Sequence, residues 1–175
     1  SYLDNVFDTI AQYENLILDI RGNEGGWLKY STLLYSYLST QDSNYCYSTS
    51  FMRNQMNGFK YWQHTDKDSA TFYTNGHEYI ESPSGQVYYT EFETQGDQKV
   101  NPKAFKGPLY LITDGLSWSA SGSLAHMAAN RDNTTMIGNE SGSAANGNCG
   151  VSNVLITLPN SQIRISIPLF YRENC

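Results

Sequence analysis

Hydrophobic positions along the chain switch repeatedly between helical and strand-like spacing, which predicts a mixed α/β fold. Apolar side chains at positions 3, 6, 7 and 10 form the one-sided stripe of a helix. The apolar run 16–20 that follows has the length of a buried strand. Glycines at 22, 25 and 26 end this run, because glycine destabilises both helices and strands. A second helical stripe is then predicted from Trp27, Tyr30, Leu34, Tyr37 and Leu38.

The last third of the chain returns to the same α/β pattern. It predicts, in order, a strand over 108–113, a turn at 114–115, a helix over 118–129, a strand over 134–138 and two closing strands over 154–158 and 162–168. A loop rich in glycine and serine covers 139–153. In the last strand Ile163, Ile165 and Ile167 alternate with polar residues, so they should share one face.

The middle of the chain, residues 44–104, has a different character. Aromatic and β-branched residues lie between turn signals, and Asn57-Gly58 and Asn75-Gly76 are dipeptides typical of hairpins. We predict a β-rich insertion of hairpins within one domain that spans 1–175. Its aromatic side chains either line a ligand groove or form the small core of the hairpins, and the second interpretation is simpler.

The composition narrows the classes of protein to which this chain can belong. Of its 175 residues, 39% are hydrophobic and 16% are charged, which is the content of a globular domain. The net charge of −6 argues against binding to nucleic acid, which requires a basic face. No apolar stretch approaches the roughly 20 residues of a membrane-spanning helix. Low charge with many uncharged polar residues is typical of proteins outside the cytoplasm.

The sequence indicates neither a cofactor nor a metal site. Cys46, Cys149 and Cys175 are too few for a disulfide scaffold and lack the close pairing of zinc ligands, so we interpret them as three unrelated structural cysteines. The glycine-rich segment 21–26 is neither a phosphate loop nor a dinucleotide-binding fingerprint. It is either a tight turn or a source of backbone N–H donors.

Candidate chemistry concentrates where the strand over 108–113 passes into the next helix. Ser117, Ser119, Ser121 and Ser123 lie at this junction. A helix N-terminus carries free N–H groups and partial positive charge, which stabilise an oxyanion. Serine is also a common helix cap without any chemistry, and the G-x-S-x-G elbow is absent here. Both interpretations of these serines stay open from the residues alone.

Taken together, four segments resemble the C-terminal processing, or tail-specific, serine peptidases. Residues 16–26, LILDIRGNEGG, resemble that family's signature of a hydrophobic strand followed by D-x-R-x-N-x-G-G. Residues 109–120, LYLITDGLSWSA, resemble its nucleophile turn, and residues 133–142, NTTMIGNESG, are similar to its next strand and loop. Residues 158–161, LPNS, resemble the turn before its closing strand. The segments occur in the family's order.

The resemblance implies a ClpP/crotonase-like α/β core and hydrolysis of a peptide or protein substrate through an acyl-enzyme. It implies Ser119 as the nucleophile, with oxyanion donors at the backbone N–H of Ala120 and of Gly25 or Gly26. Glu140 is a possible accessory residue that orients a base or a substrate amine. The family also suggests an exported protein of the periplasm or cell envelope, and it identifies the chain as a fragment of a catalytic domain.

The general base is where the sequence departs from the family. One branch activates its serine with a lysine, which would align at Ala144, and no lysine occurs after Lys106. The other branch includes tricorn-type peptidases and the interphotoreceptor retinoid-binding protein. It uses a histidine that lies upstream of the glycine signature, and residues 1–15, which occupy that place here, contain no histidine. We therefore expect membership of the second branch, with the base outside this chain. Three histidines, His64, His77 and His126, are better explained by packing or surface positions.

Two other functions compete with the peptidase hypothesis. A catalytically inactive peptidase-fold module could bind peptide, glycan or lipid in the former cleft, because neither the lysine nor the histidine is present. A crotonase-type enzyme acting on acyl-thioesters is the third possibility, although such sites do not use a positioned serine. The oligomeric state cannot be predicted from these residues.

Overall fold

The computed structural model describes residues 2–53, 59–66, 79–83, 87–89, 94–149, 153–168 and 170–175. The chain forms two compact units. The first unit comprises residues 1–49, 93–147 and 174–175, and the second comprises residues 50–92 and 148–173. His77 and both predicted Asn-Gly hairpin turns lie outside the described residues. The division of the chain into a core and an insertion over 44–104 stays a prediction.

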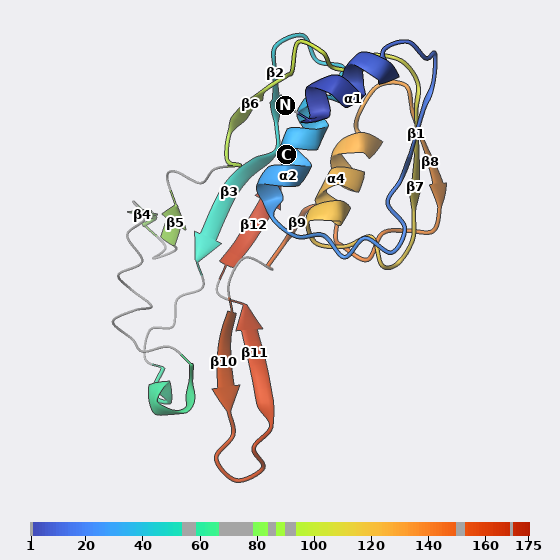
Figure 1. Cartoon of the computed structure of the whole chain (residues 1–175). Helices are drawn as coiled ribbons and strands as arrows, with labels where there is room; N and C mark the ends of the chain where they lie inside the picture. Colours follow the sequence, from blue (N-terminus) through green and yellow to red (C-terminus); the bar gives the residue numbers. More distant parts are fainter. Residues whose placement is uncertain are drawn as a thin grey trace. The chain divides into compact units, whose positions relative to one another are not determined.

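A three-stranded parallel sheet, ordered β1-β7-β8, lies at one side of the first unit (Figure 1). The strands are β1 (Leu16–Asp19), β7 (Leu109–Thr113) and β8 (Thr134–Gly138). Their register is continuous, since the first residue of β7 pairs with the first residues of both neighbours. All three strands run in the same direction, so the loops that follow β1 and β7 leave the sheet at the same edge. This edge carries both candidate loops.

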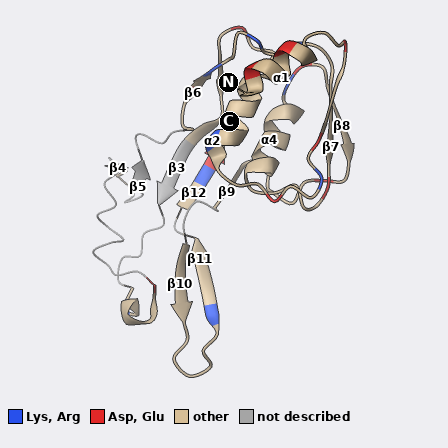
Figure 2. Ribbon diagram, viewed as in Figure 1, with Lys and Arg blue, Asp and Glu red and all other residues tan. Residues whose placement is uncertain are grey.

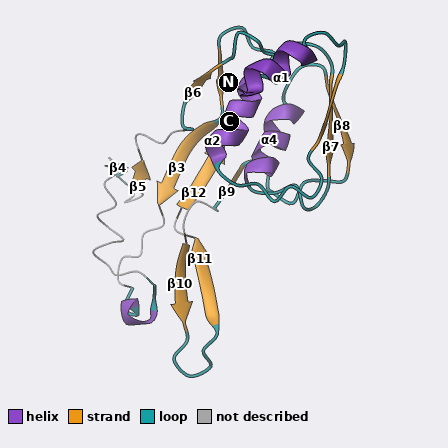
Figure 3. Ribbon diagram, in the orientation of Figure 1, coloured by secondary structure: helices purple, strands orange, loops and turns teal. Residues whose placement is uncertain are grey.

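Three helices gather beside the sheet in the first unit (Figure 3). They are α1 (Tyr2–Ile10), α2 (Leu28–Ser36) after β1, and α4 (Ala120–Ala129), which connects β7 to β8. Phe7 of α1 is buried, and the rest of the predicted stripe packs partly buried against the core. None of the helices in the described part of the chain has the length and apolar character needed to cross a bilayer. The expected α/β fold is confirmed, and its sheet in this unit is parallel.

The core of the first unit is rich in tyrosine, and the hydroxyls of its buried tyrosines Tyr35, Tyr37, Tyr45 and Tyr47 all have a hydrogen-bond partner. Tyr35 donates to the carbonyl of Met127 at 3.1 Å, and Tyr37 donates to Asp4 at 2.6 Å. Tyr45 donates to the carbonyl of Thr32 at 2.5 Å, and Tyr47 shares a hydrogen bond with Ser31. Burial raises the pKa of the Tyr45 phenol, which therefore stays neutral. The core thus accounts for four of the chain's 14 tyrosines.

The predicted apolar stripe of the second helix is wrong at its start. Trp27 and Tyr30 are exposed, whereas the buried face of α2 carries Ser31, Thr32 and Tyr35. The hydroxyls of Ser31 and Thr32 donate back to the carbonyl of Leu28, at 2.8 and 3.0 Å, which satisfies them inside the core. Side-chain hydrogen bonds of this kind allow polar residues on the buried face of a helix. Hydrophobic periodicity does not identify such residues as buried.

Two of the three cysteines form a disulfide within the first unit. Cys46 lies at the end of β2 (Asn44–Cys46), which pairs antiparallel with β6 (Asp97–Lys99), and it is bonded to Cys175. Cys149 is free and exposed. The interpretation of three unrelated cysteines is therefore wrong, because the pairing joins residues that only the tertiary fold brings together.

The second unit consists of hairpin strands. β10 (Asn153–Thr157) and β11 (Arg164–Pro168) form an antiparallel hairpin in which Val154 pairs with Ile167 and Ile156 with Ile165. A five-stranded sheet has the order β4 (Tyr79–Glu81), β5 (Val87–Tyr89), β3 (Ser48–Arg53), β12 (Phe170–Asn174), β9 (Gly147–Asn148). β4 and β5 belong to the second unit, whereas β3, β9 and β12 each contain residues of both units. The short helix η1 (Trp62–His64) is also described. The strands predicted over 154–158 and 162–168 are confirmed as β10 and β11, but they do not close the chain, because β12 follows them.

A buried arginine at the end of α4 connects three loops of the first unit. Arg131 is 5% exposed, and its guanidinium donates to the carbonyls of Phe105 at 2.8 Å and Gly107 at 2.9 Å. The same group donates to the carbonyl of Leu38. Lys and Arg positions are otherwise scattered over several elements (Figure 2). Arg131 therefore satisfies backbone acceptors that would be left without donors inside the core.

Replacing this arginine should destabilise the first unit. We expect Arg131→Leu to lower the free energy of unfolding by about 3 kcal/mol, because buried carbonyl oxygens lose their donors. Urea unfolding followed by circular dichroism measures the effect. The exposed Arg164 provides the control, and Arg164→Leu should change stability by less than about 0.5 kcal/mol. Equal losses in the two variants would contradict the role given to Arg131.

Candidate active site

The turn after β7 holds Ser119 in a conformation that ordinary residues avoid. Ser119 precedes α4 with φ 56° and ψ −123°, outside the regions that L-residues favour. Its side chain makes no capping hydrogen bond, although it occupies the cap position of the helix. Strain of this kind costs about 1–3 kcal/mol and persists only where surrounding contacts enforce it. The interpretation of Ser119 as a simple helix cap is therefore wrong.

The four candidate serines differ in what their hydroxyls contact. Ser117 is fully buried and donates to the carbonyl of Ile20 at 2.8 Å. Ser121 donates to the side-chain oxygen of Asn23 at 2.7 Å, and Ser123 donates to the carbonyl of Ser119 at 3.3 Å. Only the hydroxyl of Ser119 has no hydrogen-bond partner among the described residues, so it is the one available to a ligand.

The glycine loop after β1 lies directly against the Ser119 turn. A methyl group on Gly25 would come within 2.7 Å of the Ala120 nitrogen and 2.9 Å of the Ser119 Cβ. Gly25 and Gly26 have φ of 90° and 145°, which favours glycine at both positions. The structure thus brings together the two segments that the sequence singled out separately.

Two backbone N–H groups remain free beside Ser119. The N–H of Gly25 is occupied, because it donates to the side-chain oxygen of Asn23 at 3.0 Å. The N–H groups of Gly26 and Ala120 make no hydrogen bond within the described part of the chain. Of the expected donors, Ala120 and Gly26 are therefore available to a ligand and Gly25 is not.

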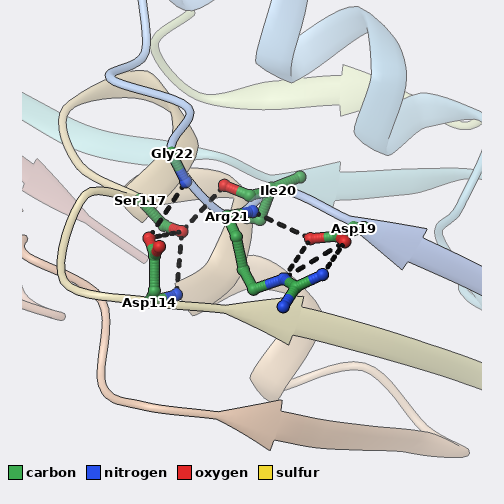
Figure 4. A network of polar contacts seen from close by, with 6 residues as sticks. All are labelled: Asp19, Ile20, Arg21, Gly22, Asp114 and Ser117. Atoms are coloured by element: carbon green, nitrogen blue, oxygen red, sulfur yellow. Dashed lines mark hydrogen bonds and ion pairs between the residues drawn. The ribbon is translucent and has the colours of Figure 1, made fainter.

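A hydrogen-bond network centred on Asp114 joins the two loops (Figure 4). The Asp114 carboxylate accepts the N–H groups of Gly22 and Leu116, each at 3.0 Å. The hydroxyl of Ser117 accepts the N–H of Asp114 at 3.1 Å while it donates to Ile20. The hydrogen bond from Gly22 is the main cause that lowers the pKa of Asp114. Asp114 thereby fixes the start of the glycine loop to the end of β7.

Asp19 and Arg21 form an exposed ion pair at the start of the glycine loop, with Nη2 and Oδ2 2.7 Å apart. Hydrogen bonds from Arg21 lower the pKa of Asp19 to about 2. Because both groups are exposed, the pair orients the loop more than it stabilises the fold.

The loop after β8 also forms hydrogen bonds with the Ser119 turn. The hydroxyl of Ser143 accepts the N–H of Ser119 at 2.7 Å, and the N–H of Gly142 donates to the carbonyl of Ser117 at 3.2 Å. Glu140 is exposed on this loop and lines a cavity of about 480 Å³ together with His126. The His126 ring forms a hydrogen bond with the carbonyl of Cys175, at 3.0 Å, and not with Ser119.

Sequence reasoning missed three residues that position the site, namely Asn23, Asp114 and Ser143. Asp114 directly follows β7, and Asn23 lies four residues after β1, so both are at the edge of the sheet where the two candidate loops begin. A polar side chain at such a position is a signal that the sequence does contain. Ser143 lies in a serine-rich loop without a distinguishing pattern. No group of three or more His, Cys, Asp or Glu side chains is arranged to hold a metal ion among the described residues.

A strained serine between a parallel strand and a helix, with free N–H groups beside it, is typical of α/β serine hydrolases. The comparison with known families agrees with this class. The chain belongs to peptidase family S41, whose family model matches residues 1–174. The family expected from the sequence motifs is therefore confirmed, whereas its branch stays a prediction.

Solved structures resemble the chain in fold. A candidate peptidase from Parabacteroides merdae ATCC 43184 is 16% identical, with a TM-score of 0.50 over 98% of this chain and 41% of its own. Mature CPAF is 14% identical, with a TM-score of 0.51 over 95% and 38%. The photosystem II D1 C-terminal processing protease is 15% identical, with a TM-score of 0.49 over 97% and 32%. No curated protein sequence gave a match. The chain thus spans less than half the length of these structures.

The Asp114 network predicts an acid-sensitive contribution to stability. Because folding lowers the pKa of Asp114, its contribution is present above the ordinary value of about 4 and is lost as the pH falls through the lowered pKa. Asp114→Asn should therefore reduce the urea midpoint at pH 7, and the difference from wild type should shrink as the pH is lowered towards 3. Asp42→Asn, at an exposed aspartate, is the control. A difference that stays constant over this range would contradict the prediction.

Proposed function

We propose that the chain carries the nucleophile and oxyanion site of a serine endopeptidase of the C-terminal processing type. Membership of peptidase family S41 supports peptide-bond hydrolysis as the reaction. The observation that carries the proposal is the strained Ser119, whose hydroxyl has no hydrogen-bond partner among the described residues and lies beside the N–H groups of Ala120 and Gly26, which also have none there. The substrate is a peptide or protein, and no cofactor takes part.

The reaction proceeds through an acyl-enzyme. The Ser119 oxygen attacks the carbonyl carbon of the scissile bond and gives its proton to a general base. The carbonyl oxygen becomes negative and accepts hydrogen bonds from Ala120 and Gly26, each worth about 3 kcal/mol in the transition state. The C–N bond then breaks, the amine leaves with the proton held by the base, and water hydrolyses the ester in a second, equivalent cycle.

The general base comes from a part of the parent protein outside this chain. No lysine follows Lys106, and no imidazole contacts the Ser119 hydroxyl among the described residues. A serine without its base keeps only the rate enhancement of the oxyanion site and of binding. The isolated chain is accordingly a weak catalyst, and Glu140 is available to orient the missing base or a substrate amine.

The same missing base supports a second candidate, a catalytically inactive module that binds a peptide, glycan or lipid at the former cleft. The two functions differ in the chemistry of Ser119, which is nucleophilic only in the peptidase.

The disulfide between Cys46 and Cys175 and the low charge support a location outside the cytoplasm, in the periplasm or cell envelope, because disulfides persist in oxidising compartments.

Covalent labelling of the full-length parent protein tests the proposed nucleophile. A fluorophosphonate should label Ser119, and Ser119→Ala should abolish the labelled peptide in mass spectrometry. Ser161→Ala, at an exposed serine in the β10–β11 turn, should leave labelling unchanged. Absence of labelling at Ser119 in a folded parent would favour the binding module instead.

A methyl group at Gly25 should disturb the oxyanion site. Gly25→Ala would place its Cβ within 2.7 Å of the Ala120 nitrogen and should lower kcat/KM of the parent about 100-fold or more, since one displaced donor has that effect. Gly115→Ala is the matched control, because a Cβ there meets no atom within 4 Å. Thermal unfolding of both variants separates lost activity from lost folding. Full activity in a folded Gly25→Ala protein would rule out this site.

A further inference from the structure

A cavity of about 210 Å³ in the first unit is lined by α2, β2, β6 and the segment before β6. None of its lining residues belongs to the candidate active site. Within the part of the chain that the structure describes, Lys29 of α2 and Lys99 of β6 are the only charged residues on this lining. An occupant therefore meets positive charge and no described carboxylate.

These two lysines differ from the other Lys and Arg residues of the first unit. The others bond to carboxylates or to backbone carbonyls, namely Arg21, Lys103, Lys106 and Arg131. Lys29 and Lys99 make no hydrogen bond or ion pair with any described residue. The Lys29 ammonium lies only over aromatic rings, 4.7 Å from the ring centre of Trp27 and 5.5 Å from that of Tyr30. Both ammonium groups are thus available to an anion.

A buried hydroxyl on the same lining also lacks a partner. Thr94 is 1% exposed, and its Oγ1 makes no hydrogen bond among the described residues. The other hydroxyls of the lining are engaged, because those of Thr32, Ser36 and Tyr45 each donate to a carbonyl of α2. A buried polar group without a partner is rare in a folded protein, and a ligand is one of the groups that can satisfy it.

We propose that this cavity binds a tetrahedral oxyanion, namely the phosphoryl group of inorganic phosphate or of a small phosphate monoester. The ammonium groups of Lys29 and Lys99 neutralise the two negative charges, and the hydroxyl of Thr94 donates to one oxygen. Lysine suits this ligand because its ammonium is a compact point charge, whereas a planar carboxylate fits the fork of arginine better. The binding is independent of the reaction proposed for Ser119.

The size of the cavity and the charge of the protein support this class of ligand. The volume equals roughly that of seven molecules of liquid water, which exceeds the five non-hydrogen atoms of phosphate and leaves room for part of an ester. The net charge of −6 repels anions from the protein as a whole. Two lysines without an acidic partner at one cavity are therefore the local exception to a repulsive field.

Titration calorimetry of the chain with inorganic phosphate tests the site. At about pH 8, where phosphate is a dianion, it should bind about fivefold more tightly than acetate. Lys29→Met and Lys99→Met should each weaken phosphate binding about fivefold. Lys103→Met is the matched control, because Lys103 pairs with Asp8 and lies outside the cavity, and it should leave binding unchanged. Equal binding of phosphate and acetate, or equal affinities in all three variants, would overturn the proposal.

Thr94→Val separates a ligand contact from a structural role. Because the Thr94 hydroxyl has no partner among the described residues, the variant should keep or raise the urea midpoint while its affinity for phosphate falls about fivefold. A lower midpoint with unchanged affinity would contradict the role given to this hydroxyl.

A second titration, with N-acetyl-phosphoserine amide, distinguishes the two sources of the phosphoryl group. Affinity equal to that of inorganic phosphate, and lost in Lys29→Met and Lys99→Met, would identify a monoester as the ligand. Binding of inorganic phosphate alone would identify the free ion.

Discussion

The hydrogen bond from the Gly22 N–H to the Asp114 carboxylate is the interaction on which the candidate site depends. β1 and β7 are adjacent and parallel, so the chain leaves both strands at the same edge. Adjacent strand ends do not by themselves hold two loops in contact, because each loop has its own conformational freedom. Asp114 and Ser117 remove that freedom by bonding to Gly22 and to the carbonyl of Ile20. The glycine loop is thereby fixed at the distance that the Ser119 turn requires.

The unusual backbone of Ser119 follows from contacts on three sides. The backbone carbonyl of Asn23 accepts the N–H of Trp118 at 3.3 Å on one side, and the hydroxyl of Ser143 accepts the N–H of Ser119 on another. α4 begins at the next residue, which fixes the direction of the chain after the turn. The N–H groups of Trp118, Ser119, Ser121 and Gly25 are thus bound, whereas those of Ala120 and Gly26 make no hydrogen bond among the described residues. The arrangement concentrates the unsatisfied polar groups of the region at one point, where a ligand can satisfy them.

The sequence could predict the strands, the helices and the segments of the site, but not how they are joined. Short apolar runs and glycine breaks depend on nearest neighbours, so β1, β7 and the loop at Gly25 were all predictable. The roles of Asp114 and Ser143 depend on contacts with residues far along the chain, which no local pattern encodes. Trp27 and Tyr30 were misplaced for a related reason, because the hydroxyls of Ser31 and Thr32 occupy the buried face that periodicity assigns to apolar residues.

The tyrosine hydroxyls in the core have a consequence for how uniquely this chain folds. An aliphatic core can be repacked in several ways at similar energy, because methyl groups have no preferred partner. Here each buried phenol must meet one particular acceptor, and a shifted packing would leave several of them unsatisfied at once. The alternatives to the native packing are thus penalised by directional bonds, which gives a small domain with few charges a single well-defined interior.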